Sequence, residues 1–199
     1  SDSEVVKIGE NSFVIQGQFA GLTNDNVEIN YSSRENKKVY SLNNKQTSRF
    51  SNIIGKFPVV LLSPADHSIT QGYPAERRRF VDSVISQGSK TYLNLLIEYN
   101  RTLKQRAYLL NRIKENNSKD FSELNAWNEK IISVGVEIIK HRKEFITEFE
   151  PYISDSYQKI IYNREEPKIH YYFLEGKCHD DLENCFEQQI NQRAEDEIR

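Results

Sequence analysis

Apolar side chains recur at heptad spacing in two stretches of this chain, residues 92–113 and 124–145, and this repeat constrains the fold most. Such spacing aligns the apolar residues along one face of an α-helix. Because only the short polar segment 115–120 separates the stretches, the two helices must run antiparallel. The sequence therefore predicts a helical hairpin with arms roughly 40 Å long. The predicted seam between the arms consists of Leu96, Tyr99, Leu103, Leu110, Leu124, Ile131, Val134 and Ile138.

The first part of the chain has a different period. Short β-branched and aromatic runs at residues 11–20, 26–33 and 37–42 are separated by turn residues and predict antiparallel strands. Residues 43–45 favour a tight hairpin turn, because Asn tolerates positive φ. Residues 57–64 have an unbroken apolar centre, which is typical of a strand buried on both faces.

The remaining elements complete an α+β fold. Pro74 suits the first turn of a helix, and Pro151 is expected to end or kink the return helix of the hairpin. Residues 168–176 are a candidate strand, and a last helix is expected from about Asp180. We therefore predict an antiparallel β head portion and a protruding antiparallel helical-hairpin arm, similar to a coiled coil. The predicted parts are residues 1–73 in the head, 74–165 in the arm, and 166–199 returning to the head.

The charge balance limits the possible partners. A formal net charge of -2 excludes a global basic field, so nucleic acid could be bound only through a local patch. Two cysteines are too few for a disulfide framework and indicate a reducing compartment. The chain has no signal peptide and no apolar run of roughly 18 residues, so we expect a cytoplasmic protein with no membrane contact. Both ends look cut, and we expect a piece of a longer protein.

Few residues predict chemistry of their own. The chain contains no Gly-rich phosphate loop, and its histidines support no catalytic triad, so we predict no catalytic residue. The thiols, imidazole and carboxylates of residues 178–185 match no zinc spacing, so we predict no metal site, and Asp180 is better explained as a helix N-cap. Arg106 and His141 interrupt the heptads as polar residues that set the register of the arm. Trp127 is interpreted as core packing in preference to a partner anchor.

Three adjacent arginines, Arg77, Arg78 and Arg79, stand near the start of the helix that begins at Pro74. Arg78 can pair with Asp82, one turn away. Arg77 and Arg79 point about 200° apart on a helix, so all three cannot hold one phosphate. A structural role and a phosphate-facing role both stay open for individual members of the triplet.

Around this triplet the sequence resembles the RecF family of DNA replication and repair proteins. That family shows a strand followed by Ser-Pro-acid-Asp, then Gly-x-Pro-x-Glu-Arg-Arg, Phe-x-Asp, Tyr-x-x-x-Leu and Tyr-Asn-x-x-Leu-Lys-Gln-Arg. The match covers about residues 11–199, more loosely before residue 50 and after Pro151, and Ala107 departs from the usual Asn. The matching positions are Ser63, Pro64, Asp66, Gly72, Pro74, Glu76, Arg77, Arg78, Phe80, Asp82, Tyr92, Tyr99, Asn100, Leu103, Lys104, Gln105 and Arg106.

The resemblance implies part of an ATP-binding-cassette ATPase related to the SMC proteins. The family's Walker A loop would precede this stretch, and its signature motif and Walker B would follow it. Ser63, Pro64 and Asp66 occupy the position of the Q-loop, although no Gln stands there. The arginine triplet would couple the nucleotide site to the arm or contact DNA. ATP and Mg²⁺ are the cofactors of the full-length family, and we expect neither to bind this chain strongly.

The implied function is recombination mediation in DNA repair and the SOS response. Such a protein binds ATP and DNA, at junctions of single and double strands, and loads recombinase at gaps. The implied partners are DNA, mediator proteins such as RecR, and a second copy in an ATP-dependent homodimer. The alternative is a coiled-coil scaffold without nucleotide chemistry, because the heptads suit both. The resemblance implies a DNA-dependent ATPase for the full-length family, and we expect this chain alone to be inactive as an ATPase.

Overall fold

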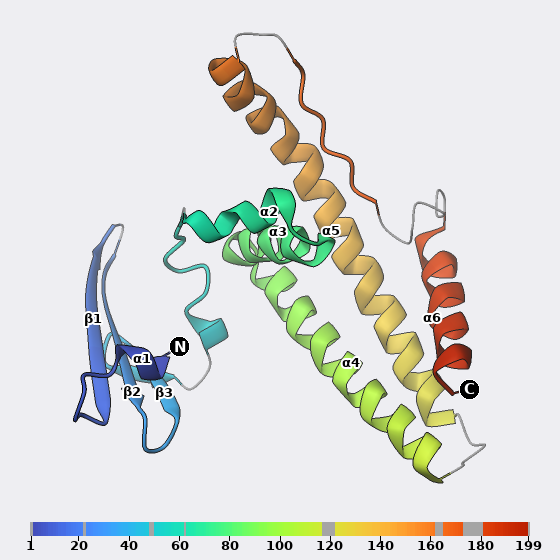
Figure 1. Ribbon diagram of the computed structural model, residues 1–199, viewed down its shortest axis with the longest axis horizontal. Helices are drawn as coiled ribbons and strands as arrows, with labels where there is room; N and C mark the ends of the chain where they lie inside the picture. The colour runs from blue at the N-terminus through green and yellow to red at the C-terminus, as the bar shows by residue number, and fades with distance from the viewer. Residues whose placement is uncertain are drawn as a thin grey trace. The chain divides into compact units, whose positions relative to one another are not determined.

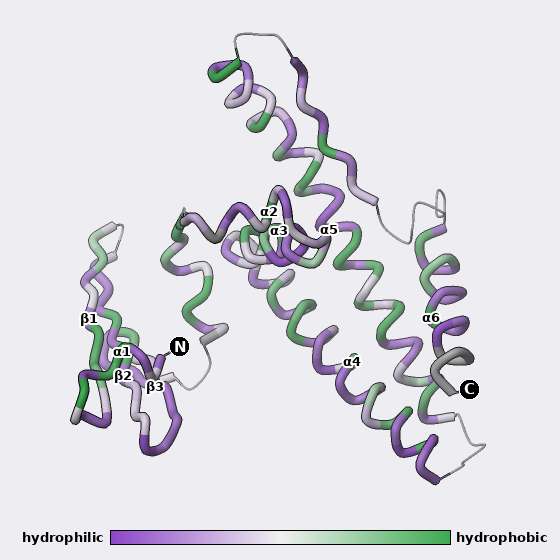
Figure 2. Tube along the Cα trace, viewed as in Figure 1, coloured by the Kyte–Doolittle hydropathy of each residue, from purple (hydrophilic) through white to green (hydrophobic). Residues whose placement is uncertain are grey.

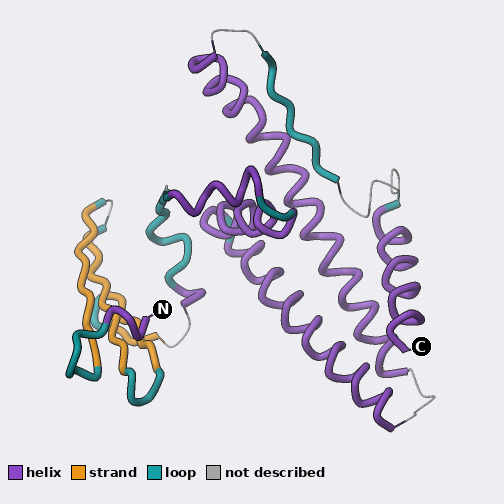
Figure 3. Tube along the Cα trace, in the orientation of Figure 1, coloured by secondary structure: helices purple, strands orange, loops and turns teal. Residues whose placement is uncertain are grey.

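The computed structural model shows two compact units, Ser1–Val60 and Leu61–Arg199 (Figure 1). It describes residues 2–21, 23–47, 50–61, 63–116, 122–161, 165–172 and 181–198. Strands occur in the first unit, and the described part of the second unit is built from helices and loops (Figure 3). The expected α+β fold, with an antiparallel sheet and a helical hairpin, is therefore confirmed. Among the described helices, none is both long and apolar enough for a membrane span. The three predicted functional parts stay a prediction.

The first unit is a meander of four antiparallel strands in the order β1-β2-β3-β4. The predicted turn at residues 43–45 is confirmed: Asn43 and Asn44 have φ of 49° and 64° and join β3 to β4. Asn43 also accepts a hydrogen bond of 2.8 Å from the backbone N–H of Asn26, which holds the turn against β2. The elements are α1 (Asp2–Val5), β1 (Ser12–Ala20), β2 (Asn24–Ser32), β3 (Lys37–Leu42), β4 (Lys45–Thr47) and the 3₁₀ turn η1 (Phe50–Asn52).

The predicted buried strand at residues 57–64 is wrong for this chain. Residues 58–61 form no regular secondary structure. Val60 and Leu61 are 98% and 80% exposed. A strand forms only where another strand offers backbone hydrogen bonds, and no described strand pairs with residues 58–61.

The second unit is organised around two long helices that run antiparallel, α4 and α5 (Figure 1). Pro151 does not end α5, since the helix continues for ten further residues to Ile161, and the alternative expectation of a kink at Pro151 stays a prediction. Residues 117–120 of the predicted polar turn lie outside the described residues. The elements are the 3₁₀ turn η2 (Pro64–Asp66), α2 (His67–Gln71), α3 (Pro74–Gly88), α4 (Lys90–Asn116), α5 (Ser122–Ile161) and α6 (Leu182–Ile198).

The hairpin seam follows the prediction on α5 and departs from it on α4. The four predicted seam residues of α5, Leu124, Ile131, Val134 and Ile138, are all buried. On α4, Leu103 is 37% exposed, while its neighbour Thr102 is 3% exposed and its hydroxyl donates to the Glu98 carbonyl oxygen at 2.9 Å. Leu96, Tyr99 and Leu110 are partly buried at the edges of the seam.

The register on α4 therefore differs by one residue at two of the predicted seam positions, Leu103 and Leu110. Tyr92, Tyr99, Arg106 and Ile113 repeat every seven residues along α4, and all but the partly buried Tyr99 are buried. Between them the helix buries Thr102 and Leu109, where the prediction has Leu103 and Leu110. Both choices satisfy heptad spacing, and only packing against α5 distinguishes them.

α6 is a third helix that packs along α5, which the sequence analysis did not predict. Ile131, Ile132, Val136 and Ile190 form a buried cluster between the two helices. Gly135 permits this approach, because a Cβ there would lie 2.4 Å from the Phe186 ring. α5 is accordingly buried on two sides, and it is more hydrophobic along its length than α4 (Figure 2).

The region before α6 differs from the prediction. Residues 168–172 form no strand, and residues 173–180 lie outside the described residues. α6 begins close to the expected position, but Asp181 caps it: its carboxylate accepts a hydrogen bond of 3.0 Å from the backbone N–H of Asn184. Asp180, the predicted cap, is outside the described residues. Cys185 is disulfide-bonded.

Candidate functional site

The segment before the arginine triplet is fixed by local backbone bonds. The Asp66 carboxylate accepts a hydrogen bond from the backbone N–H of Ser63 at 2.5 Å, and the Ser63 carbonyl accepts one from Asp66 at 3.0 Å. These two bonds close η2, which also contains Pro64. The three residues of the predicted Q-loop position thus form one tight turn ahead of α2, and their role towards a nucleotide stays a prediction.

Gly72 makes the turn from α2 into α3 possible. Its backbone N–H donates to the Ser68 carbonyl oxygen at 2.8 Å, which terminates α2. A Cβ at this position would lie 2.3 Å from that same oxygen, so no other residue fits without moving the backbone. Pro74 then opens α3 in the first helical turn, as predicted.

The three arginines of α3 have three different surroundings. Arg77 donates through Nη1 to the carbonyl oxygens of Gly72, at 3.0 Å, and Ile69, at 3.4 Å. It therefore satisfies carbonyl groups at the end of α2, which a helix cannot satisfy itself. Arg79 forms an exposed ion pair with Glu76 at 2.9 Å. The Arg78 side chain is exposed and makes no hydrogen bond or ion pair with any other residue in the described part of the chain.

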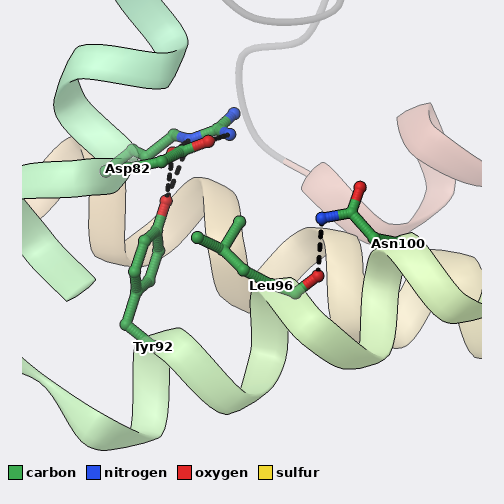
Figure 4. Close-up of polar contacts among 5 residues, drawn as sticks. Asp82, Tyr92, Leu96 and Asn100 are labelled. Atoms are coloured by element: carbon green, nitrogen blue, oxygen red, sulfur yellow. Dashed lines mark hydrogen bonds and ion pairs between the residues drawn. The ribbon is translucent and has the colours of Figure 1, made fainter. Parts of the chain in front are cut away.

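Asp82 pairs with Arg142 of α5, so the predicted pairing with Arg78 is wrong. Arg142 donates through Nε and Nη2 to the two carboxylate oxygens of Asp82, each at 2.8 Å. The Tyr92 hydroxyl donates to Asp82 at 2.6 Å and accepts from Arg142 at 3.1 Å (Figure 4). Tyr171 adds a further side-chain hydrogen bond to Arg142. We call Asp82, Tyr92 and Arg142 the three-helix cluster, because they come from α3, α4 and α5.

Burial strengthens the interactions among the three side chains of the three-helix cluster. Tyr92 is fully buried, and the side chains of Arg142 and Asp82 are 15% and 22% exposed. Burial, and then the hydrogen bond to Asp82, raise the pKa of Tyr92. Burial lowers the pKa of Arg142, but the hydrogen bond and charge of Asp82 outweigh this effect and raise it. The cluster is therefore a neutral phenol beside a bidentate ion pair, which fixes α3 to both arms of the hairpin.

Sequence reasoning did not find Arg142. Its one available signal was position: Arg142 lies four residues after Ile138, on the face of α5 that packs in the hairpin. A cation on such a face requires a carboxylate nearby. The sequence could not show that this carboxylate stands 60 residues earlier, on α3.

Other polar residues of the hairpin hold its register or pack in it. Arg106 is 7% exposed and donates through Nε to Asn128 across the hairpin at 2.8 Å, which fits its predicted role. His141 contacts the Tyr92 ring edge-on, at 5.6 Å between ring centroids. Trp127 packs against the cluster of Leu109, Ile113 and Leu124, as predicted. Close to the three-helix cluster, the Asn100 amide donates to the Leu96 carbonyl oxygen at 2.9 Å (Figure 4).

Tyr92→Phe is expected to flatten the loss of stability at alkaline pH. The pKa of Tyr92 is raised above 10.0, so its proton stabilises the fold below about pH 10, and this contribution is lost as pH rises towards the folded pKa. Denaturant titrations between about pH 9 and pH 12 measure the slope. Tyr108→Phe, at a 68% exposed position of the same helix, is the control and should keep the wild-type slope. An unchanged slope for Tyr92→Phe would contradict the assignment.

The described residues contain no group of three or more His, Cys, Asp or Glu side chains placed to hold a metal ion. Near neutral pH the raised pKa values keep the Tyr92 phenol and the Arg142 guanidinium protonated. The three-helix cluster joins α3, which carries the exposed Arg78, to both helices of the hairpin.

No protein-family model matches the chain. The chain is 37% identical over 180 residues to the DNA replication and repair protein RecF of Prosthecochloris aestuarii, a match that covers 89% of this chain and 48% of that protein. It is 36% identical over 171 residues to RecF of Bacteroides fragilis, covering 85% of this chain and 45% of the relative.

Solved structures give the same result. The recombination mediator protein RecF-ATP in the RecFOR pathway has a TM-score of 0.86 at 26% identity, covering 98% of this chain and 53% of that chain. The RecF-ATPrS structure has a TM-score of 0.81 at 29% identity, covering 100% and 53%. The fold is thus that of part of a recombination mediator. The chain belongs to the RecF family and spans about half the length of the curated relatives that it matches.

Proposed function

We propose that this chain supplies the arm and part of the head of a protein that binds ATP and DNA in gap repair and recombinase loading. In this proposal, α2 and α3 carry the state of a nucleotide site to the hairpin. A second copy of the protein and mediator proteins such as RecR are the proposed protein partners. The family membership and the DNA replication and repair function of the relatives support this direction.

The three-helix cluster is the observation that carries the proposal. A helix that only filled space beside a hairpin would need apolar contacts alone, such as those of Ile85 with Val134 and Ile138. α3 adds a bidentate ion pair to α5 and a hydrogen bond to α4. α3 also holds the end of α2, because Arg77 of α3 donates to the Gly72 carbonyl oxygen. A displacement of the turn at Ser63 and Asp66 would therefore move the hairpin as well.

The scaffold alternative has weaker support. A coiled-coil module needs the seam of α4 and α5, and the buried pair of Arg106 and Asn128 would set its register. It needs neither the tight turn at Gly72 nor an arginine engaged with the end of α2. These two features have a use only if the segment before α3 must be held in one position.

Arg78→Ala in the full-length protein is expected to lower the ATP-dependent affinity for DNA or for a second copy roughly tenfold or more. Arg78 is the exposed guanidinium of the triplet without a described partner, and one hydrogen bond to an ionised group contributes about 1.5 to 3 kcal/mol. Affinity is measured with and without ATP by sedimentation for the dimer and by fluorescence anisotropy for DNA.

Arg79→Ala is the matched control, because Glu76 already engages that guanidinium. It should behave as the wild type does. Equal behaviour of the Arg78 and Arg79 variants would contradict a phosphate-facing role for Arg78. A wild-type protein whose DNA binding and self-association are indifferent to ATP would favour the scaffold alternative.

A further inference from the structure

The outer face of α4 lies opposite the hairpin seam. Exposed residues recur along it at intervals of three or four, which places them on one stripe of the helix. Ile97 is 47% exposed and Tyr108 is 68% exposed, although both are large apolar or aromatic side chains. Hydrophilic and hydrophobic segments alternate along α4 (Figure 2). The stripe consists of Lys90, Asn94, Ile97, Arg101, Lys104 and Tyr108.

The charge of this helix departs from that of the whole chain. Residues 99–114 contain five cationic side chains and no acidic one, in a chain of net charge -2. Solvated helix faces normally intersperse both signs, because like charges one turn apart repel each other. A one-sign segment indicates attraction to an outside charge.

Three of the five cations, Arg101, Lys104 and Lys114, are available to an outside anion, and the first two lie on the stripe. Arg106 is buried against Asn128, and Arg112 pairs with Glu123 at 2.7 Å. Arg101 and Lys104 are exposed and have no hydrogen bond or ion pair to another described residue through their side chains. Several lysines of α5 are different, since they pair with carboxylates, as Lys130 does with Glu98 at 2.5 Å.

We propose that the outer face of α4 binds the phosphodiester backbone of DNA. Arg101 and Lys104 contact phosphates, and Tyr108, about one turn further along, offers its exposed ring to an unpaired base. The proposal rests on the proposed function, which makes DNA the partner, and it adds the surface.

The chemistry of the face favours DNA over an acidic protein surface. Three residues of helix separate the two cations by about 4.5 Å along its axis. Duplex DNA carries one negative charge per roughly 1.7 Å of its length, so such a pair always has phosphates within reach. An exposed aromatic ring beside a basic groove is the usual platform for single-stranded bases, and an acidic protein has no equivalent use for it.

The test compares two double variants of equal charge. Arg101→Gln with Lys104→Gln removes the proposed phosphate contacts. Lys143→Gln with Lys168→Gln removes two exposed charges elsewhere and is the matched control. Fluorescence anisotropy with the 199-residue chain gives the dissociation constant for labelled duplex and single-stranded DNA over a salt series.

The α4 variant is expected to bind DNA tenfold or more weakly at low salt, and its slope of log affinity against log salt should be about two units shallower than that of the wild type. The control should keep the wild-type slope. Tyr108→Ala should weaken binding of single-stranded DNA roughly tenfold and leave duplex binding nearly unchanged. Equal slopes for the α4 variant and the control would overturn the proposal, and so would DNA binding too weak to measure in the wild-type chain at low salt.

The same variants in the full-length protein separate this proposal from the proposed function. ATP-dependent DNA binding that survives unchanged in the α4 variant overturns the α4 surface and leaves the proposed function standing. The opposite outcome is a wild-type protein whose DNA binding does not depend on ATP, together with an α4 variant whose slope of log affinity against log salt is about two units shallower. That result supports the α4 surface and contradicts the proposed function.

Discussion

Arg142→Met is expected to lower the free energy of unfolding of the helical unit by about 3 kcal/mol. The substitution keeps an unbranched side chain of similar length and removes the guanidinium that pairs with both oxygens of Asp82. Breaking a buried ion pair typically costs about 3 to 5 kcal/mol, because one charge stays buried without compensation. The lower end of this energy range applies here, because the Asp82 side chain is 22% exposed. Denaturant unfolding followed by far-ultraviolet circular dichroism measures the change.

Arg112→Met is the matched control for this prediction. Arg112 also pairs with a carboxylate, Glu123, at 2.7 Å, but the two side chains are 50% and 59% exposed. An exposed pair of this kind contributes about 0 to 1 kcal/mol. The two pairs differ little in distance and greatly in burial and in the number of hydrogen bonds, so the difference between the variants measures what the buried cluster contributes. Equal losses would show that the three-helix cluster does not fix α3 to the hairpin.

Ile131→Ala is expected to cost about 3 to 5 kcal/mol, the other large effect. Truncation of a buried Ile loses the transfer free energy of its methyl and methylene groups and leaves a cavity. Ile131 is 0% exposed and packs in the cluster between α5 and α6, close to Tyr99 of α4. Few residues that line the site can collapse into the space, because three helices hold it open.

Ile160→Ala is the control, because Ile160 stands on the same helix and is 74% exposed. It should change the free energy of unfolding by no more than about 0.5 kcal/mol. Both variants lose the same atoms, and Ile160 lies in the last turn of α5, so the difference between them reports mainly the packing of Ile131. A similar small effect for Ile131→Ala would mean that α6 does not pack on α5 in solution.

The hairpin was predictable because its causes are local. On α5, apolar side chains keep heptad spacing from Leu124 to Ile138, and few polar residues compete for the inner face. The turn at Asn43 and Asn44 was predictable for the same reason, since positive φ is a property of the residues themselves. Arg106 was recognisable from the sequence as a polar residue in an apolar repeat, and in the structure it donates a hydrogen bond to Asn128.

The register of α4 shows where local reasoning ends. Leu109 and Leu110 are adjacent and equally hydrophobic, so the sequence gives no preference between them. Thr102 looks less suitable for a core than Leu103, yet it is the one buried, because its hydroxyl bonds to a carbonyl of its own helix. The apolar run of residues 57–64 shows the converse. Its composition favours a buried strand, but no strand pairs with it in the described structure.

The sequence by itself determined the elements of this protein: a meander of strands, a helical hairpin, and an arginine triplet whose members cannot act on one phosphate. Only the tertiary structure decided their partners. It paired Asp82 with Arg142 instead of Arg78, packed α6 along α5, and gave Arg77 and Arg79 contacts that leave Arg78 exposed. The physical reason is distance along the chain. Periodicity and turn propensity act over a few residues, whereas the partner of a buried charge is whichever group the packed helices bring beside it.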